Sequence, residues 1–197
     1  ANWTHNNSIF SARSFFQVGG VQPSRSNDFG GTLTAPLWTG SFLTLNSGQR
    51  KLRGQVNGNV LVPAADERTP TATDPARLAV VQRILAGYPA ELPNRTDIDS
   101  RALNTNDRQD INDDRASATF EQDTSKKDRL ILRYNLTLQA VEAFQLVGGQ
   151  NPDTTTKNHD ARITWSRTWN PATTTDFSVG YGRVSSVLEQ DEDWFGR

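Results

Sequence analysis

The sequence predicts an all-β protein whose antiparallel up-and-down strands form part of a transmembrane β-barrel. The segment that indicates this most strongly is residues 128–139, in which apolar and polar side chains alternate. Side chains on a strand point alternately to opposite faces, so this segment has one apolar and one polar face. About 9–11 such residues, tilted, cross a bilayer as one strand of a barrel.

The same alternation recurs along the chain and sets the order of the elements. Six strands are expected in total, and short turns join them in pairs. The pairs are separated by long connections at about residues 54–112 and 140–157. Outer-membrane barrels have short turns on the periplasmic side and long loops outside the cell, so the two connections are predicted to be extracellular. The other five strands are expected at about residues 28–37, 43–53, 116–121, 160–166 and 175–182.

The alternation also predicts which side chains meet lipid and which face the lumen. On one interpretation the polar candidates have a functional role in the lumen, and on the other they form an ordinary polar wall held by pairs across the strands. The lipid-facing candidates are Leu130, Leu132, Tyr134, Leu136, Leu138, Trp165, Phe177 and Val179. The lumen-facing candidates are Arg133, Asn135, Arg162, Thr164, Asp176 and Ser178.

Tryptophans and lysines gather at the short turns. Trp38, Trp169, Lys126 and Lys127 all lie in or next to them. Tryptophans at a membrane–water interface form an aromatic girdle, which places these residues at the periplasmic rim. The alternative is that the tryptophans belong to the core of a soluble β-sandwich, which also uses strands of period two.

One short helix is expected inside the first long loop, at about residues 75–86. Asp74 is suited to cap it, Pro75 to begin it and Gly87 to end it. One side of the helix carries an apolar stripe at helical spacing. On one interpretation the stripe packs the loop onto the rim of the barrel, and on the other it contacts a ligand. The stripe consists of Leu78, Val81, Leu85 and Tyr88.

The amino-acid composition argues against several classes of function. A formal net charge of −1 in 197 residues provides no basic surface for nucleic acid, and the absence of Cys excludes disulfides and thiol catalysis. His5 and His159 are far apart and are expected at the surface of loops, so no metal site is predicted. The acidic run at residues 189–193 lacks the spacing of a Ca²⁺ loop and is interpreted as a solvated loop. No nucleotide-binding or hydrolase motif is present, so no enzyme activity and no cofactor are expected.

Short stretches resemble a known family, in the same order along nearly the whole chain. They are Ser11–Phe16 (SARSFF), Asn27–Leu33 (NDFGGTL) with Ala35-Pro36-Leu37, Val62–Arg68 (VPAADER), Tyr88-Pro89 with Leu92-Pro93-Asn94, and Ser125–Tyr134 (SKKDRLILRY). Together they resemble the start of the barrel of Oar-like TonB-dependent receptors, which carry a carboxypeptidase-regulatory-like N-terminal domain. One departure is Thr34-Ala35-Pro36, where that family commonly has Gly-Gly-Pro; it affects only the approach to a turn.

The resemblance implies what the protein does and where it works. Residues 1–197 are expected to be one part of a longer barrel, without the plug domain or the remaining strands. The implied function is energised uptake or surface binding of an unidentified solute at the bacterial outer membrane. Its partners would be membrane lipid, the plug and rest of the barrel, the TonB complex through regions outside this segment, and the solute. Two alternatives stay open: a soluble extracellular β-sandwich module for adhesion or carbohydrate binding, and an accessory subunit of a larger membrane assembly.

Overall fold

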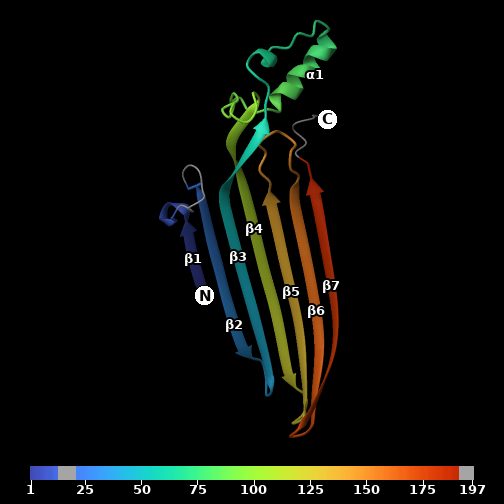
Figure 1. Ribbon diagram of the computed structural model, residues 1–197. Helices are drawn as coiled ribbons and strands as arrows, with labels where there is room; N and C mark the ends of the chain where they lie inside the picture. The colour runs from blue at the N-terminus through green and yellow to red at the C-terminus, as the bar shows by residue number, and fades with distance from the viewer. Residues whose placement is uncertain (13–20, 191–197) are drawn as a thin grey trace.

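Seven antiparallel strands form one sheet in a computed structural model that describes residues 1–12 and 21–190. Each strand pairs with its neighbours in the sequence, so the order in space is β1 to β7 (Figure 1). This arrangement confirms the predicted all-β, up-and-down architecture. The strands are β1 Asn2–Asn7, β2 Ser24–Pro36, β3 Ser41–Leu61, β4 Ala102–Asp123, β5 Asp128–Glu142, β6 Asp153–Asn170 and β7 Thr173–Glu189.

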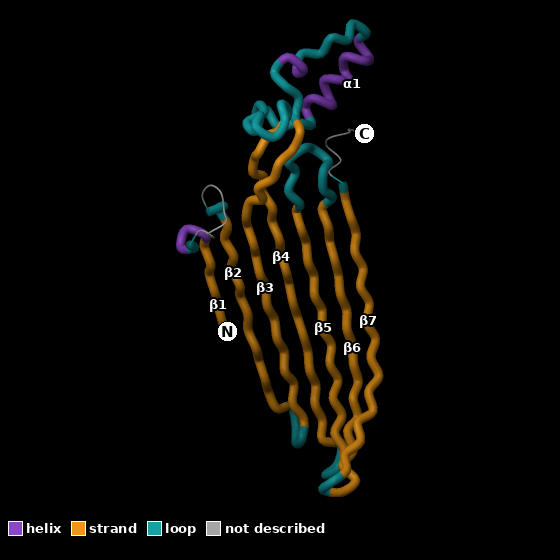
Figure 2. Tube along the Cα trace, in the orientation of Figure 1, coloured by secondary structure: helices purple, strands orange, loops and turns teal. Residues whose placement is uncertain are grey.

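The connections at the two ends of the sheet differ in length. The tight turns after β2, β4 and β6 lie together at one end, and the longer loops with the helix lie at the other (Figure 2). The first turn closes where the Ser41 N–H donates to the Trp38 carbonyl at 3.0 Å. Gly40 has a φ of 74° there, a conformation that costs glycine little because it has no Cβ.

The strands are longer than the alternation predicted, and this corrects the loop boundaries. β3 continues to Leu61 and β4 begins at Ala102, so the first long connection is residues 62–101 rather than 54–112. The second is residues 143–152 rather than 140–157. Past the apolar band the pattern changes: in β3 Val56 and Val60 lie on the opposite face from Gln55 and Asn57, and β4 is polar at every position from Asn104 to Asp110. The alternation that marks the apolar band therefore does not continue to the ends of these two strands. One more strand than the six expected, β1 at Asn2–Asn7, brings the number of strands to seven.

The predicted helix is present. α1 spans Pro75–Ala86, and the Asp74 carboxylate accepts a hydrogen bond from the Arg77 N–H at 3.0 Å. The Gly87 N–H donates back to the Ile84 carbonyl at 3.1 Å and ends it. Two 3₁₀ turns, η1 Ser8–Phe10 and η2 Asp66–Arg68, complete the described elements. None of the helices in the described ranges is long and apolar enough to cross a membrane.

The buried apolar residues lie outside the tall part of the sheet. In the described ranges they are Val62, Ala102, Leu103 and Leu146, each at most 5% exposed. They gather where the β3–β4 and β5–β6 loops meet, and a Cβ added to Gly58 of β3 would clash with the Leu146 side chain. Within residues 1–12 and 21–190 no second apolar layer packs against the sheet. The sandwich alternative required such a layer, and the structure does not support it.

Candidate membrane-facing wall and extracellular loop

The pairing register sorts the predicted side chains onto two faces without exception. Leu130 lies opposite Trp165, which lies opposite Phe177, and the next row contains Leu132 and Val179. All eight lipid-facing candidates therefore share one face. Many of them are open: Phe177 is 62% exposed and Val179 is 57% exposed. That these side chains contact lipid remains a prediction. It is supported by the finding that all of them lie on one apolar face.

The apolar face has the height of a membrane band. Leu130 to Leu138 cover nine positions of β5. Nine residues rise about 27 Å along a strand, or roughly 20 Å after a tilt of about 40°. Trp3 on β1 lies opposite Phe29 and continues this face toward the other edge. The sequence does not predict this position for Trp3, because too few residues precede it to show alternation.

The opposite face is polar and is held by pairs across the strands. Thr164 and Ser178 share a hydrogen bond of 2.9 Å between their hydroxyl oxygens, and the Ser166 hydroxyl donates to Asp176 at 2.5 Å. All six lumen-facing candidates lie here. Such pairs are what an ordinary polar wall requires, and contact of these residues with a plug or a solute stays a prediction.

One pair on this face is different. Arg133 and Arg162 lie directly opposite each other on β5 and β6. Neither takes part in an ion pair among the described residues, although Asn135, one step along, donates to Asp160 at 3.2 Å. Like charges directly opposite each other destabilise a sheet, so an anionic group close to this pair would stabilise it.

The two histidines lie in strands rather than in the loops expected for them. His5 is in β1, where its Nδ1 is 2.7 Å from the Asn27 Oδ1. His159 is in β6, and its Nδ1 is 2.8 Å from the Tyr134 hydroxyl. The sequence could not show this because polar residues surround both. No group of three or more possible metal-ligating side chains occurs in residues 1–12 and 21–190.

The short-turn end carries the features of a membrane interface. The Trp38 Nε1 donates to the Gln122 Oε1 at 2.6 Å, and the Arg167 guanidinium lies 4.5 Å from the centre of the Trp169 ring. Tryptophans that combine an apolar ring with a satisfied polar tip suit the boundary between lipid and water.

In the long loop between β3 and β4, which is predicted to be extracellular, Arg68 joins two stretches of chain. Arg68 donates to the carbonyl oxygens of Pro63 at 3.2 Å, Pro89 at 3.0 Å and Glu91 at 2.6 Å. These contacts join two stretches that the sequence showed only as separate motifs. The preceding residue, Glu67, accepts from the Ala64 N–H at 2.9 Å and pairs with Arg101. The Ala64 hydrogen bond, and after it the Arg101 guanidinium, lower the pKa of Glu67.

The helix leaves an apolar hollow beside the β5–β6 loop. Leu78, Val81, Leu85 and Tyr88 are half-buried, as expected of a stripe that packs the loop. A second edge, with Val80 and Ile84, borders a hollow of about 400 Å³ together with Tyr88 and Val147. The helix end is joined to that loop by a hydrogen bond of 2.7 Å from the Gly148 N–H to the Gly87 carbonyl. A ligand-contacting role for the helix remains a hypothesis.

Two stretches of interest fall partly outside the described residues. They are the Ser11–Phe16 stretch, from residue 13 onward, and the acidic run at residues 189–193, from residue 191 onward.

The fold and the two faces agree with a comparison with known families. Residues 3–196 match the family model described as "Outer membrane beta barrel domain". The searches of curated proteins and of solved structures returned no match. Since the match covers nearly the whole chain, the protein belongs to the outer membrane beta barrel domain family and its location is the bacterial outer membrane.

Proposed function

We propose that this chain forms part of the barrel wall of a TonB-dependent receptor that takes up or binds a solute at the cell surface. The observation that carries this proposal is the set of Arg68 contacts. They join the Val62–Arg68 stretch to Tyr88-Pro89 and the residues after it, two stretches that resemble Oar-like receptors. Each of these two stretches resembles the same family, and the two also contact each other. Together they support a loop structure like that of the family better than one matching stretch does.

Two other features support the same function. The loop at residues 62–101 stands beyond the strand ends and is tied together by hydrogen bonds, as a surface that captures a solute requires. The polar wall contains Arg133 and Arg162, which form no ion pair within residues 1–12 and 21–190 and which an acidic plug or an anionic solute would neutralise. On this proposal, solute binding outside is coupled to TonB through the plug, and this chain supplies the wall and part of the capture surface.

The test is recovery of TonB with the full-length protein from intact cells. An affinity tag is placed in the exposed segment at residues 69–73, cells are treated with formaldehyde, and the tagged protein is purified and probed for TonB. We expect TonB in the purified material, and none with an equally abundant porin tagged in the same way. TonB recovery no greater than with the porin would contradict the proposal. A fixed stoichiometric set of other membrane proteins in its place would favour the accessory-subunit alternative.

A further inference from the structure

The apolar face of the sheet gives way to a cluster of cations near the long-loop end. The register aligns Asn27 with Lys51, and then Arg25 with Arg53, on the same side as Phe29. Arg108 follows one step farther along β4, next to Gln55. These four basic residues, Arg25, Lys51, Arg53 and Arg108, are called the outer basic cluster below. Because they share a face with the apolar band, the cluster points toward the membrane side rather than into the lumen.

The height of the cluster matches lipid head groups. Arg25 lies four residues beyond Phe29 along β2, a rise of about 13 Å along the strand or roughly 10 Å along the membrane normal. The head-group layer of a bilayer extends about 5–8 Å beyond the hydrocarbon on each side. Long basic side chains reach back toward this layer while their stems lie on apolar surface. The guanidinium of Arg25 and the ammonium of Lys51 are therefore within reach of phosphates at the outer leaflet.

Two members of the cluster are fixed in place. The buried Asp110 carboxylate, whose side chain is 2% exposed, pairs with the Arg53 Nε at 3.2 Å and with Arg108. Arg53 also donates to the Leu52 carbonyl at 2.8 Å and to the Asn112 Oδ1 at 2.8 Å. Ordering these side chains in advance lowers the entropy cost of binding a phosphate oxygen.

The other two members have no carboxylate partner. Neither Arg25 nor Lys51 forms an ion pair with any residue of the described ranges, and both are exposed. Asp110 offsets only one of the four positive charges. Glu142 lies opposite Asp110 and, with Asp153, borders a neighbouring hollow that Arg108 also lines. These carboxylates therefore offset the charge of Arg108, and the uncompensated charge of the cluster is on Arg25 and Lys51.

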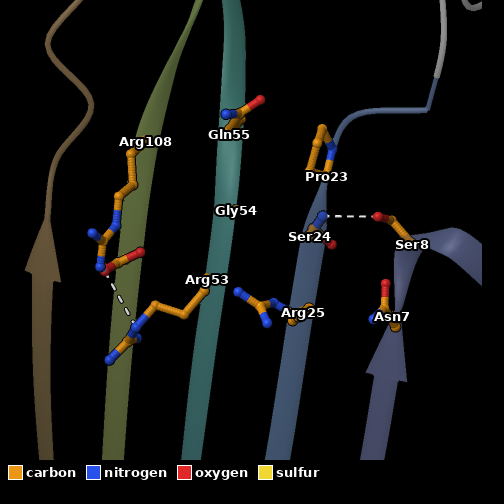
Figure 3. A pocket seen from close by; sticks show the side chains of 10 residues that line it. Asn7, Ser8, Pro23, Ser24, Arg25, Arg53, Gly54, Gln55 and Arg108 are labelled. Atoms are coloured by element: carbon orange, nitrogen blue, oxygen red, sulfur yellow. Dashed lines mark hydrogen bonds and ion pairs between the residues drawn. The ribbon is translucent and has the colours of Figure 1, made fainter.

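Three of the four basic residues border a shallow space that can accept a head group, and Lys51 lies outside its lining. An open hollow of about 600 Å³ lies over β1–β4 and is lined by Arg25, Arg53 and Arg108 together with Asn7 and Ser24 (Figure 3). In Figure 3 the Arg25 guanidinium reaches toward β3, whereas the Arg53 side chain extends to β4, where its guanidinium lies near Arg108. Several guanidinium donors around one hollow suit an oxyanion with several oxygens.

We propose that the outer basic cluster binds the phosphate groups of an outer-leaflet glycolipid. Its acyl chains would lie along the apolar band near Phe29 while its phosphates meet Arg25 and Lys51. The cluster would then hold a lipid at a defined position on the barrel wall. This inference rests on membership of the outer-membrane barrel family and does not depend on TonB.

The experiment uses the full-length protein purified in detergent and native mass spectrometry. The probes are lipid A with both phosphates, lipid A with its phosphates removed, and inorganic phosphate alone as a competitor. The test variant is Arg25→Gln/Lys51→Gln, which leaves the Arg53–Asp110–Arg108 contacts intact. The matched control is Lys126→Gln/Lys127→Gln, which removes the same charge at the opposite end of the sheet.

We expect the test variant to bind phosphorylated lipid A roughly 10- to 30-fold more weakly, and the control variant to bind it like the wild type. Dephosphorylated lipid A should not distinguish the three proteins. Equal binding by the test variant and the wild type would overturn the proposal, and so would an equal loss in the control. Full displacement of the lipid by millimolar inorganic phosphate would instead identify a site for a soluble anion. Should the double variant not fold, Arg25→Gln alone is compared with Arg25→Lys, which keeps the charge.

Discussion

The guanidinium of Arg68 donates to the carbonyl oxygen of Pro89 at 3.0 Å and thereby joins the two ends of the extracellular loop that flank α1. Carbonyl groups in a loop have no strand partners and are costly to leave unsatisfied when water is excluded. Arg68 satisfies three of them at once, so a single side chain maintains the path of the chain on both sides of the helix.

Replacing Arg68 should loosen the loop and leave the wall intact. In Arg68→Ala we expect amide exchange at residues 87–92 to rise by about tenfold or more, because hydrogen bonds from a charged donor contribute about 1.5–3 kcal/mol. Hydrogen-exchange mass spectrometry on the full-length protein measures this. Arg77→Ala on the exposed side of α1 is the control. Equal exchange in the two variants would show that Arg68 does not hold the loop.

The small buried cluster should be sensitive to truncation. Leu103 is 1% exposed, whereas Leu61, near it at the end of β3, is 60% exposed. Leu103→Ala should lower the free energy of loop opening by about 2–5 kcal/mol, because it removes buried apolar surface and leaves a cavity. Leu61→Ala should change it by less than about 0.5 kcal/mol. Exchange rates at residues 60–64 and 101–105 would report both, and similar effects of the two changes would contradict the burial pattern.

A side chain at Gly58 should displace the β5–β6 loop. The Cβ of Gly58→Ala would clash with the Cδ1 of the buried Leu146 side chain. We expect a destabilisation of about 1–3 kcal/mol, relieved in part when Leu146→Ala is added. A double-mutant cycle on loop protection measures this coupling. Additive effects would mean that the two residues do not contact each other.

The two faces should respond differently to a charge. Leu132→Arg places a cation in the apolar band and should cost about 2–4 kcal/mol of membrane stability. Ile131→Arg is the matched control, since Ile131 is the next residue and lies opposite Glu121 on the polar face. The folded fraction on cold detergent gels should fall for Leu132→Arg alone. A loss confined to Ile131→Arg would reverse the assignment of the faces.

Acid should release the contact between Glu67 and Ala64. The pKa of Glu67 is lowered in the folded loop from its ordinary value of 4.5, so its contribution is present above that value and is lost as the pH falls through the folded pKa. Protection of the Ala64 amide, corrected for intrinsic exchange, should therefore fall below about pH 4.5 in the wild type. In Glu67→Gln the protection should be weaker and no longer change with pH. A wild type without this pH dependence would contradict the assignment.

The sequence predicted those strands whose two faces have different surroundings. Between Leu130 and Leu138 one face is apolar and the other polar, so the alternation is visible and every candidate in this segment lies on its expected side. Past the apolar band β4 is polar on both faces from Asn104 to Asp110, and in β3 the apolar residues change to the other face. Asn57 and Asn104, which share a hydrogen bond of 3.0 Å, therefore fall in the predicted loop although the structure has them in strands. The helix was predictable because its caps are local signals.

The parts of the candidate site that could not be predicted depend on contacts between distant segments. Arg68 is 21 residues from Pro89 in sequence, and the spacing of the motifs does not show that they touch. The outer basic cluster is also invisible in the sequence. Arg25, Lys51 and Arg108 come from three strands, and only the register brings them to one height.

The pairing of each strand with its sequence neighbours affects how such a wall is built and how it can evolve. Each strand pairs with its neighbours in the sequence, so no strand needs a partner from a distant part of the chain. Such a sheet can be assembled one hairpin at a time at its edge. Duplication or deletion of one hairpin would change the number of strands in the barrel by two and leave the pairing of the other hairpins unchanged. The circumference can therefore vary among descendants of one gene while the turns, girdle and loop anchors are inherited as complete units.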